Sequence, residues 1–248
     1  MEEYINTIER LKNDEDYYGD FGKQFLSNSD IGTLLKKPED LHKPLKKTTA
    51  MLVGGYFHTV VLEPDKINKY KIIQERNRNT KAYKEMSGGE LCLLQHEVDQ
   101  IELLKDKMLE NDILKGLIHG THCDSKIEYE VPNITVLCDL KWKGKVDILN
   151  HDEKLIIDIK TTSDIDSFKW SSKKYNYDSQ AYIYRNLFDY DFIFIVIDKN
   201  THKLNIFEVS NEAYERGQEK VEKAAEAYKL YYQSKDFDPK QYLEVNTI

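Results

Sequence analysis

Apolar residues recur at helical spacing in the first half of this chain, and the spacing becomes strand-like in the second half. The helices predicted in the first half cover residues 30–35, 49–62 and 94–111. Ser29 or Asp30 is expected to cap the first helix and Thr48 or Thr49 the second, which ends before Pro64. The segment between the second and third helices is basic, and its apolar residues show no regular spacing.

Beyond residue 120 the apolar residues form short runs that are typical of strands. The predicted strands cover residues 127–131, 134–140, 145–149, 155–160, 192–197 and 204–209. Turns are expected at Pro132-Asn133 and at Asn150-His151-Asp152, and further helices over 178–187 and 211–233. The run over 192–197 is apolar throughout, as in a strand that is covered on both faces.

This order of elements predicts an α/β fold in which helices flank a sheet. We expect a single domain over residues 1–248, mainly helical over 1–119, with the sheet and its helices over 120–248. The composition, 40% apolar and 32% charged, is that of a globular chain. No apolar run approaches the roughly 20 residues that span a bilayer, and the N-terminus is acidic, so a cytoplasmic protein is expected.

Net charge and cysteine content only partly limit which ligands and cofactors the chain can bind. The net charge of −8 counts against binding to DNA through phosphate contacts. It does not exclude such binding, because carboxylates can cluster around a metal while basic residues concentrate in one channel. The three cysteines, Cys92, Cys123 and Cys138, match neither a disulfide framework nor a zinc or iron–sulfur site, so we expect buried reduced thiols.

Two neighbouring strands carry the candidate chemistry. Side chains alternate along a strand, so Asp158 and Lys160 share one face while the flanking isoleucines point to the core. The short turn over 150–152 makes the strand of Asp147 an antiparallel neighbour, which brings two carboxylates and an ammonium to one face. Hard oxygen ligands suit Mg²⁺ or Mn²⁺, and a lysine beside such an ion suits phosphodiester hydrolysis.

The Asp-x-Lys spacing alone is weak evidence, because it recurs at Asp124–Lys126, Asp152–Lys154 and Asp238–Lys240 as ordinary surface charge. A charged pair inside an apolar strand is costly unless it is paired or binds a metal, and the alternative here is a buried salt bridge. Gln180 and Tyr184 share a helix face, which by itself needs no special explanation.

Two further features are ambiguous when they are considered alone. His58 on an apolar helix is more often a hydrogen-bonded core residue than a ligand. The basic segment with Arg76, Arg78 and Lys81 is as consistent with a solvated loop as with a phosphate-binding surface.

Taken together, four motifs resemble one nuclease family. They are Gly55…His58, Lys145-Val146-Asp147, Ile157-Asp158-Ile159-Lys160-Thr161-Thr162 and Gln180…Tyr184. The set resembles the RecB-like branch of the PD-(D/E)XK nucleases, and most of all the RecE (exonuclease VIII) nuclease domains of phages and prophages. The resemblance runs along nearly the whole chain and implies a central mixed sheet flanked by helices.

The resemblance also implies roles for individual residues. His58, Asp147 and Asp158 would be metal-site residues, Lys160 the catalytic lysine, and Gln180 and Tyr184 supports of the site. The family has a further acidic residue before its first strand, and here the matching position resembles Asp124, with Glu128 as a rival. Arg76, Arg78, Lys81 and Thr161 would contact DNA.

The resemblance finally implies a biological activity. A Mg²⁺-dependent exonuclease, for which Mn²⁺ substitutes, would degrade linear double-stranded DNA 5′→3′ and leave a 3′ single strand for recombination. It would form a ring-shaped homo-oligomer, a trimer or a tetramer, and work with a RecT-type annealing protein in a bacterial cell. A restriction or repair endonuclease and a non-catalytic DNA-binding module with the same fold are the alternatives.

Overall fold

A computed structural model describes residues 2–44 and 46–238 of the chain. The helices are α1 (Glu2–Leu11), α2 (Asp14–Tyr18), α3 (Asn28–Leu34), α4 (Thr49–Leu62), α5 (Lys81–Ser87), α6 (Gln95–Leu109), α7 (Asp112–His119), α8 (Phe168–Lys174), α9 (Tyr177–Phe188) and α10 (Asn211–Tyr228). The strands are β1 (Ile72–Ile73), β2 (Leu93–Leu94), β3 (Ile127–Leu137), β4 (Leu140–Asn150), β5 (Leu155–Thr162), β6 (Asp191–Asp198) and β7 (Leu204–Glu208). None of the helices within these described ranges has the length and apolar character needed to cross a membrane.

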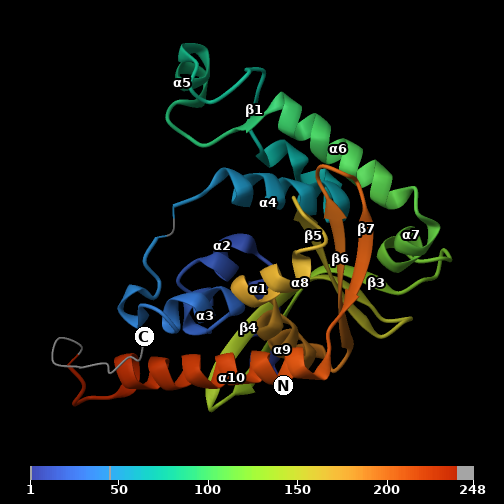
Figure 1. The fold of residues 1–248 in the computed structure, drawn as a ribbon. Helices are drawn as coiled ribbons and strands as arrows, with labels where there is room; N and C mark the ends of the chain where they lie inside the picture. Colours follow the sequence, from blue (N-terminus) through green and yellow to red (C-terminus); the bar gives the residue numbers. More distant parts are fainter. Residues whose placement is uncertain (1, 45, 239–248) are drawn as a thin grey trace.

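The main sheet lies between two layers of helices (Figure 1). Its strand order is β3-β4-β5-β6-β7. Only the β5–β6 pair is parallel, and the other neighbouring strands run antiparallel. The predicted α/β sheet with flanking helices is therefore confirmed, and the sheet is mixed.

Strand β6 shows how the sheet separates two hydrophobic cores. Phe192, Phe194 and Val196 belong to the cluster that α9 and α10 cover. The alternate residues over 193–197 belong to the cluster that α4, α6 and α7 cover. A strand buried on both faces reads as a continuous apolar run, which is why this strand was recognisable in the sequence.

The core under α4 supplies a stability prediction. Phe57 is fully buried there, whereas Leu103 on α6 is 43% exposed. Phe57→Ala leaves a cavity and is expected to lower the free energy of unfolding by about 3–5 kcal/mol. Leu103→Ala is expected to change it by no more than about 0.5 kcal/mol. Urea unfolding followed by circular dichroism measures both, and equal effects would contradict the assignment of the core.

One predicted turn is wrong, and this changes the register of the first hairpin. No turn forms at Pro132-Asn133; strand β3 continues through both residues to Leu137. The chain reverses instead at Cys138 and Asp139, which both have positive φ angles, 53° and 60°. Such a pair of left-handed residues matches the twist of a two-residue hairpin turn. Pro132 is tolerated because β3 is an edge strand.

Several helix boundaries in the structure differ from the predicted ones. Ser27, not Ser29 or Asp30, caps α3, because its backbone N–H is bonded to Asp30 in a capping box. The predicted helix over 94–111 divides into α6 and α7, and Asn111 caps α7. Helix α8 was not predicted. Thr48 caps α4 as expected. The three cysteines are free thiols, but Cys123 is exposed rather than buried.

The basic segment after α4 forms a projection from the body of the protein, seen at the top of Figure 1 with β1 and α5. Arg78 attaches this projection to α6 through a bidentate ion pair with Glu97, at 2.6 and 2.9 Å, and a hydrogen bond to the Cys92 carbonyl. The guanidinium of Arg78 therefore has a structural partner. Arg76 and Lys81 are exposed on the projection.

Candidate active site

The candidate site begins where strands β4 and β5 separate. Their pairing runs from Asn150↔Leu155 to Ile148↔Ile157 and stops there. At the next position, Asp147 accepts a hydrogen bond from the backbone N–H of Ile159 at 2.9 Å. A carboxylate thus takes the place of the missing backbone acceptor. The separation of the strands opens the sheet at the point where the acidic residues lie.

Asp158 and Lys160 lie on one face of β5, as the alternation predicted. They form an ion pair, and Asp158 is 1% exposed. The second carboxylate oxygen of Asp158 accepts a hydrogen bond from Nε2 of Gln180 on α9 at 2.5 Å. Ile157 and Ile159 point to the opposite core. Two independent partners therefore fix the orientation of this carboxylate.

His58 reaches the same site from helix α4. Its Nδ1 lies 3.1 Å from Oδ2 of Asp147. The histidine is thus directed at a carboxylate of the site. Within the described residues, one atom each from His58, Glu130 and Asp147 all lie within 4.8 Å of one another, a spacing that suits a metal ion.

Glu130 was missed by the sequence analysis. The register of β3 and β4 on either side, Tyr129↔Ile148 and Val131↔Val146, places Glu130 opposite Asp147. Its φ angle of 50° interrupts the regular strand. A left-handed non-glycine residue is strained, and such strain is concentrated at functional sites.

The two acidic candidates named from the sequence lie elsewhere. Asp124 is exposed in the turn between α7 and β3. Glu128 is bonded to His151 at 2.7 Å on an exposed part of the sheet edge. Of these three acidic side chains, Glu130 is the one that lines the cleft with His58 and Asp147.

A cleft of about 710 Å³ is lined by the side chains of the candidate site: His58, Glu130, Asp147, Asp158, Lys160 and Gln180. Helix α2 forms part of its wall: Asp14 pairs with Lys145 at 2.6 Å, and the Tyr17 carbonyl accepts a hydrogen bond from Lys143. Tyr184 also lines the cleft, and its hydroxyl donates to the Lys145 carbonyl at 3.1 Å. Tyr184 is thus a positioning residue for β4.

Residues 23–242 match a family described as a PDDEXK-like domain of unknown function (DUF3799). The chain belongs to this family. The PD-(D/E)XK resemblance predicted from the sequence is thereby confirmed for nearly the whole domain.

This PDDEXK-like domain was also compared with solved structures of other proteins. A Eubacterium rectale protein called a "putative exonuclease" has a TM-score of 0.62 and 17% identity, over 85% of this chain and 82% of that one. A "phage related exonuclease" from Haemophilus somnus 129PT has a TM-score of 0.37 and 18% identity, over 82% of this chain and 93% of that one. The first of these shows that the fold is shared. No curated protein matches the chain.

The PDDEXK-like site brings together six of the side chains named from the sequence and leaves others outside. His58, Asp147, Asp158, Lys160, Gln180 and Tyr184 all line the cleft. Thr161 follows Lys160 on β5 and is half-buried, but it lies outside the cleft lining. Arg76, Arg78 and Lys81 lie on the projection and not in the cleft.

Burial and mutual repulsion shift the pKa values of two carboxyl groups upward. Burial, reinforced by Asp147, raises the pKa of Asp158 to about 6. The same two causes raise the pKa of Glu130 to about 7. Burial also acts on Asp147, but His58, Lys160 and the Ile159 N–H outweigh it and lower the pKa of Asp147. Ionising Asp158 and Glu130 in this buried site is therefore unfavourable without a further cation.

The cations of the site are stabilised in their charged forms. Burial alone would lower the pKa of His58, but Asp147 outweighs it and the net shift is upward. Burial would likewise lower the pKa of Lys160, and Asp158 and Asp147 reverse the direction. Nucleases with this fold use divalent metals, and the spacing of the donor atoms of His58, Glu130 and Asp147 fits such an ion. These three residues would hold it, together with Asp158, which lines the same cleft.

The raised pKa values predict how cation binding depends on pH. Glu130 and Asp158 must lose their protons to act as ligands, so affinity for Mn²⁺ is expected to rise about tenfold or more between about pH 5.5 and pH 7.5. In the metal-free protein, the protonated forms of these two groups contribute to the free energy of unfolding at low pH. That contribution is lost as the pH rises through about 6 to 7, because both groups then ionise in a buried site. Calorimetric titrations at several pH values test this; an affinity independent of pH would contradict it.

Proposed function

We propose that this chain is a metal-dependent deoxyribonuclease that degrades linear double-stranded DNA from its ends. One observation carries the proposal: Asp147, Asp158 and Lys160 meet in one cleft, with His58 and Gln180 bonded to the two aspartates. A pair of carboxylates beside an ammonium suits hydrolysis of a phosphodiester. The family assignment supports the same chemistry.

Each side chain has a role in the proposed reaction. The bound cation, Mg²⁺ with Mn²⁺ as a substitute, would polarise the phosphoryl group and supply a nucleophilic water. Lys160 remains protonated near neutral pH because Asp158 and Asp147 outweigh the lowering of its pKa by burial, so it would present positive charge to the scissile phosphate. Gln180 holds Asp158 in the orientation that keeps the other carboxylate oxygen turned toward Lys160.

The biological part of the proposal rests on the sequence resemblance. We infer 5′→3′ degradation that leaves 3′ single strands for recombination by strand annealing. The partners would be a RecT-type annealing protein and further copies of this chain in a trimeric or tetrameric ring. The setting would be the cytoplasm of a bacterial cell that carries the gene on a phage or prophage.

A cleavage assay on labelled DNA tests the proposal. Its substrates are linear duplexes labelled at either the 5′ or the 3′ end, and a closed circle of the same sequence. With Mg²⁺, we expect early release of the 5′ label, late release of the 3′ label and survival of the circle. Cleavage of the circle would instead support an endonuclease. No metal-dependent cleavage of any substrate would support the non-catalytic alternative.

A further inference from the structure

A second hollow lies beside the catalytic cleft and shares one residue with it. This side pocket, of about 340 Å³, is formed by α8, the end of β7 and the beginning of α10. Tyr177 lines both the side pocket and the catalytic cleft. Its ring centre lies 5.3 Å from the Lys160 ammonium. A single aromatic ring therefore separates the side pocket from the proposed catalytic lysine.

The side pocket has an aromatic lining. Phe168 packs against Phe207 with ring centres 4.7 Å apart and against Tyr177 at 5.7 Å. Trp170 on α8 also lines the pocket, and it is 64% exposed. The exposed ring of this tryptophan offers a flat surface for stacking. Every nucleobase can stack on such a ring, so the contact does not depend on nucleotide sequence.

Cations adjoin the aromatic lining. The ammonium groups of Lys169 and Lys173 lie 5.4 and 5.6 Å from the Trp170 ring centre. Arg216 of α10 lines the same pocket, and its side chain is 37% exposed. Glu208 and Glu212 lie on the rim toward β7 and α10, so the charges are divided between the two sides of the pocket. The phosphate of a ligand is therefore expected to lie on the α8 side of the pocket, away from the two glutamates.

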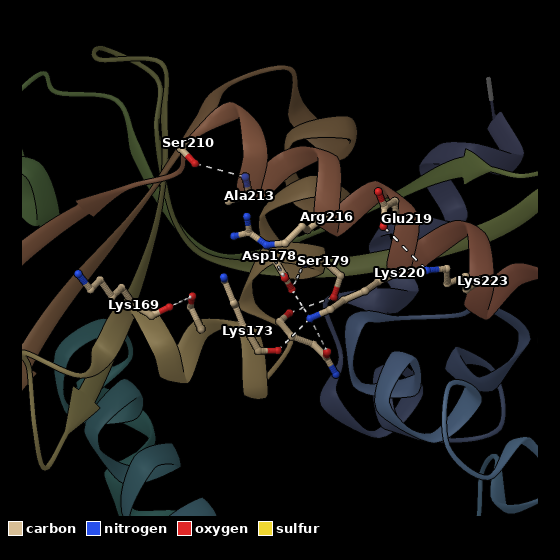
Figure 2. A network of polar contacts seen from close by, with 12 residues as sticks. Lys169, Lys173, Asp178, Ser179, Ser210, Ala213, Arg216, Glu219, Lys220 and Lys223 are labelled. Carbon is tan, nitrogen blue, oxygen red and sulfur yellow. Dashed lines mark hydrogen bonds and ion pairs between the residues drawn. The ribbon is translucent and has the colours of Figure 1, made fainter. Parts of the chain in front are cut away.

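A buried polar network holds this wall in place (Figure 2). Lys220 donates to Asp178 at 2.7 Å and to the Lys173 carbonyl at 2.9 Å, which ties α8 to α10. The other oxygen of Asp178 lies 3.8 Å from Nε of Arg216. Within the described part of the chain, both of these buried atoms lack a hydrogen-bond partner. Nε of Arg216 is therefore held near the Asp178 carboxylate without a hydrogen bond to it.

We propose that the side pocket binds one nucleotide, with its base against Trp170 and its phosphate between Lys169, Lys173 and Arg216. The identity of the ligand rests on the proposed nuclease function. The nucleotide is either a released mononucleotide or a unit of the single strand that leaves the cleft past Tyr177. Both sources present the same chemistry, an aromatic base joined to a phosphate.

Tryptophan fluorescence gives a local signal for this binding. The chain has two tryptophans, and Trp142 is fully buried, so Trp170 is the one that a ligand can reach. We expect quenching when dTMP or a ten-residue oligothymidylate is added in EDTA, where no cleavage occurs. Trp170→Phe should abolish the quenching. Quenching by dTMP identifies a free nucleotide as ligand, and quenching by the oligonucleotide alone identifies a strand.

Charge-reversal variants separate this proposal from binding in the catalytic cleft. The double variant Lys169→Glu, Lys173→Glu is expected to weaken binding about tenfold or more. The control Lys115→Glu, Lys203→Glu changes the net charge equally at exposed sites outside both hollows and should leave it within about twofold.

Three results would overturn the side-pocket proposal. They are no quenching by either ligand, thymidine binding as tightly as dTMP, and equal weakening of binding by both double variants. Asp158→Asn should still bind the nucleotide, because the titration needs no catalysis. The fluorescence titration can therefore be carried out on a protein without nuclease activity. A negative titration would overturn the side-pocket proposal but not the proposed nuclease function.

Discussion

Lys160→Ala is expected to lower the rate of cleavage of linear duplex DNA by about 10²–10⁴-fold. The ammonium lies in the cleft, paired with a carboxylate that is 1% exposed, and no other cation is bonded to that carboxylate among the described residues. Removal of the side chain takes away the positive charge that the scissile phosphate would meet. Single-turnover cleavage at saturating Mg²⁺ measures the effect without a contribution from product release.

A matched control comes from the same local pattern elsewhere in the chain. Lys126 follows Asp124 at the same Asp-x-Lys spacing but is exposed and lies outside the cleft. Lys126→Ala should cleave DNA within about twofold of the unmodified protein. Similar losses in both variants would show that the cleft is not where cleavage occurs.

Glu130→Gln is expected to weaken Mn²⁺ binding and DNA cleavage by about 10-fold to 100-fold. Glu130 is one of the three side chains whose donor atoms lie within 4.8 Å of one another. The amide keeps the shape of the side chain but lacks the charge that a divalent ion requires. Calorimetric titration with Mn²⁺ and the cleavage assay together measure the change.

The same substitution should not weaken the metal-free fold. Burial and Asp147 raise the pKa of Glu130 to about 7, so above that pH the ionised carboxylate destabilises the folded protein. A neutral glutamine removes that cost, and unfolding at about pH 8 should show equal or greater stability. Asp124→Asn is the control and should change neither metal binding nor cleavage. A metal-binding loss in Asp124→Asn but not in Glu130→Gln would reverse the assignment.

The central pair of the site was predictable because a local pattern determined it. Asp158 and Lys160 stand in a strand whose other residues are apolar, and strand alternation alone places them together. The short turn between β4 and β5, expected at 150–152 and formed by residues 151–154, then brought Asp147 alongside. Gln180 was placed on the correct helix face by its spacing from Tyr184.

Glu130 was missed because one turn was misplaced. A turn at Pro132-Asn133 would fold strand 127–131 onto its immediate neighbour and remove Glu130 from Asp147. The actual turn at Cys138-Asp139 lengthens the hairpin and sets Glu130 opposite Asp147. Proline stops a central strand but not an edge strand, and edge position is a property of the whole sheet.

Contacts between distant parts of the chain were beyond reach of the sequence pattern. Asp14 on α2, for example, meets Lys145 on β4 across 131 positions. The basic segment was ambiguous for the same reason: Arg78 has a structural partner in Glu97, which no spacing rule reveals. The short helix α8, which carries Trp170, has too few residues for a periodic signal.

A crystal of this protein soaked in Mn²⁺, with data collected at a wavelength where manganese scatters anomalously, would show whether Asp147 and Asp158 hold a metal ion. We expect one strong anomalous peak at roughly 2.0–2.3 Å from carboxylate oxygens of Asp147 and Asp158, with His58 and Glu130 beside it. A fully occupied ion elsewhere on the protein, with no peak between the two aspartates, would contradict it.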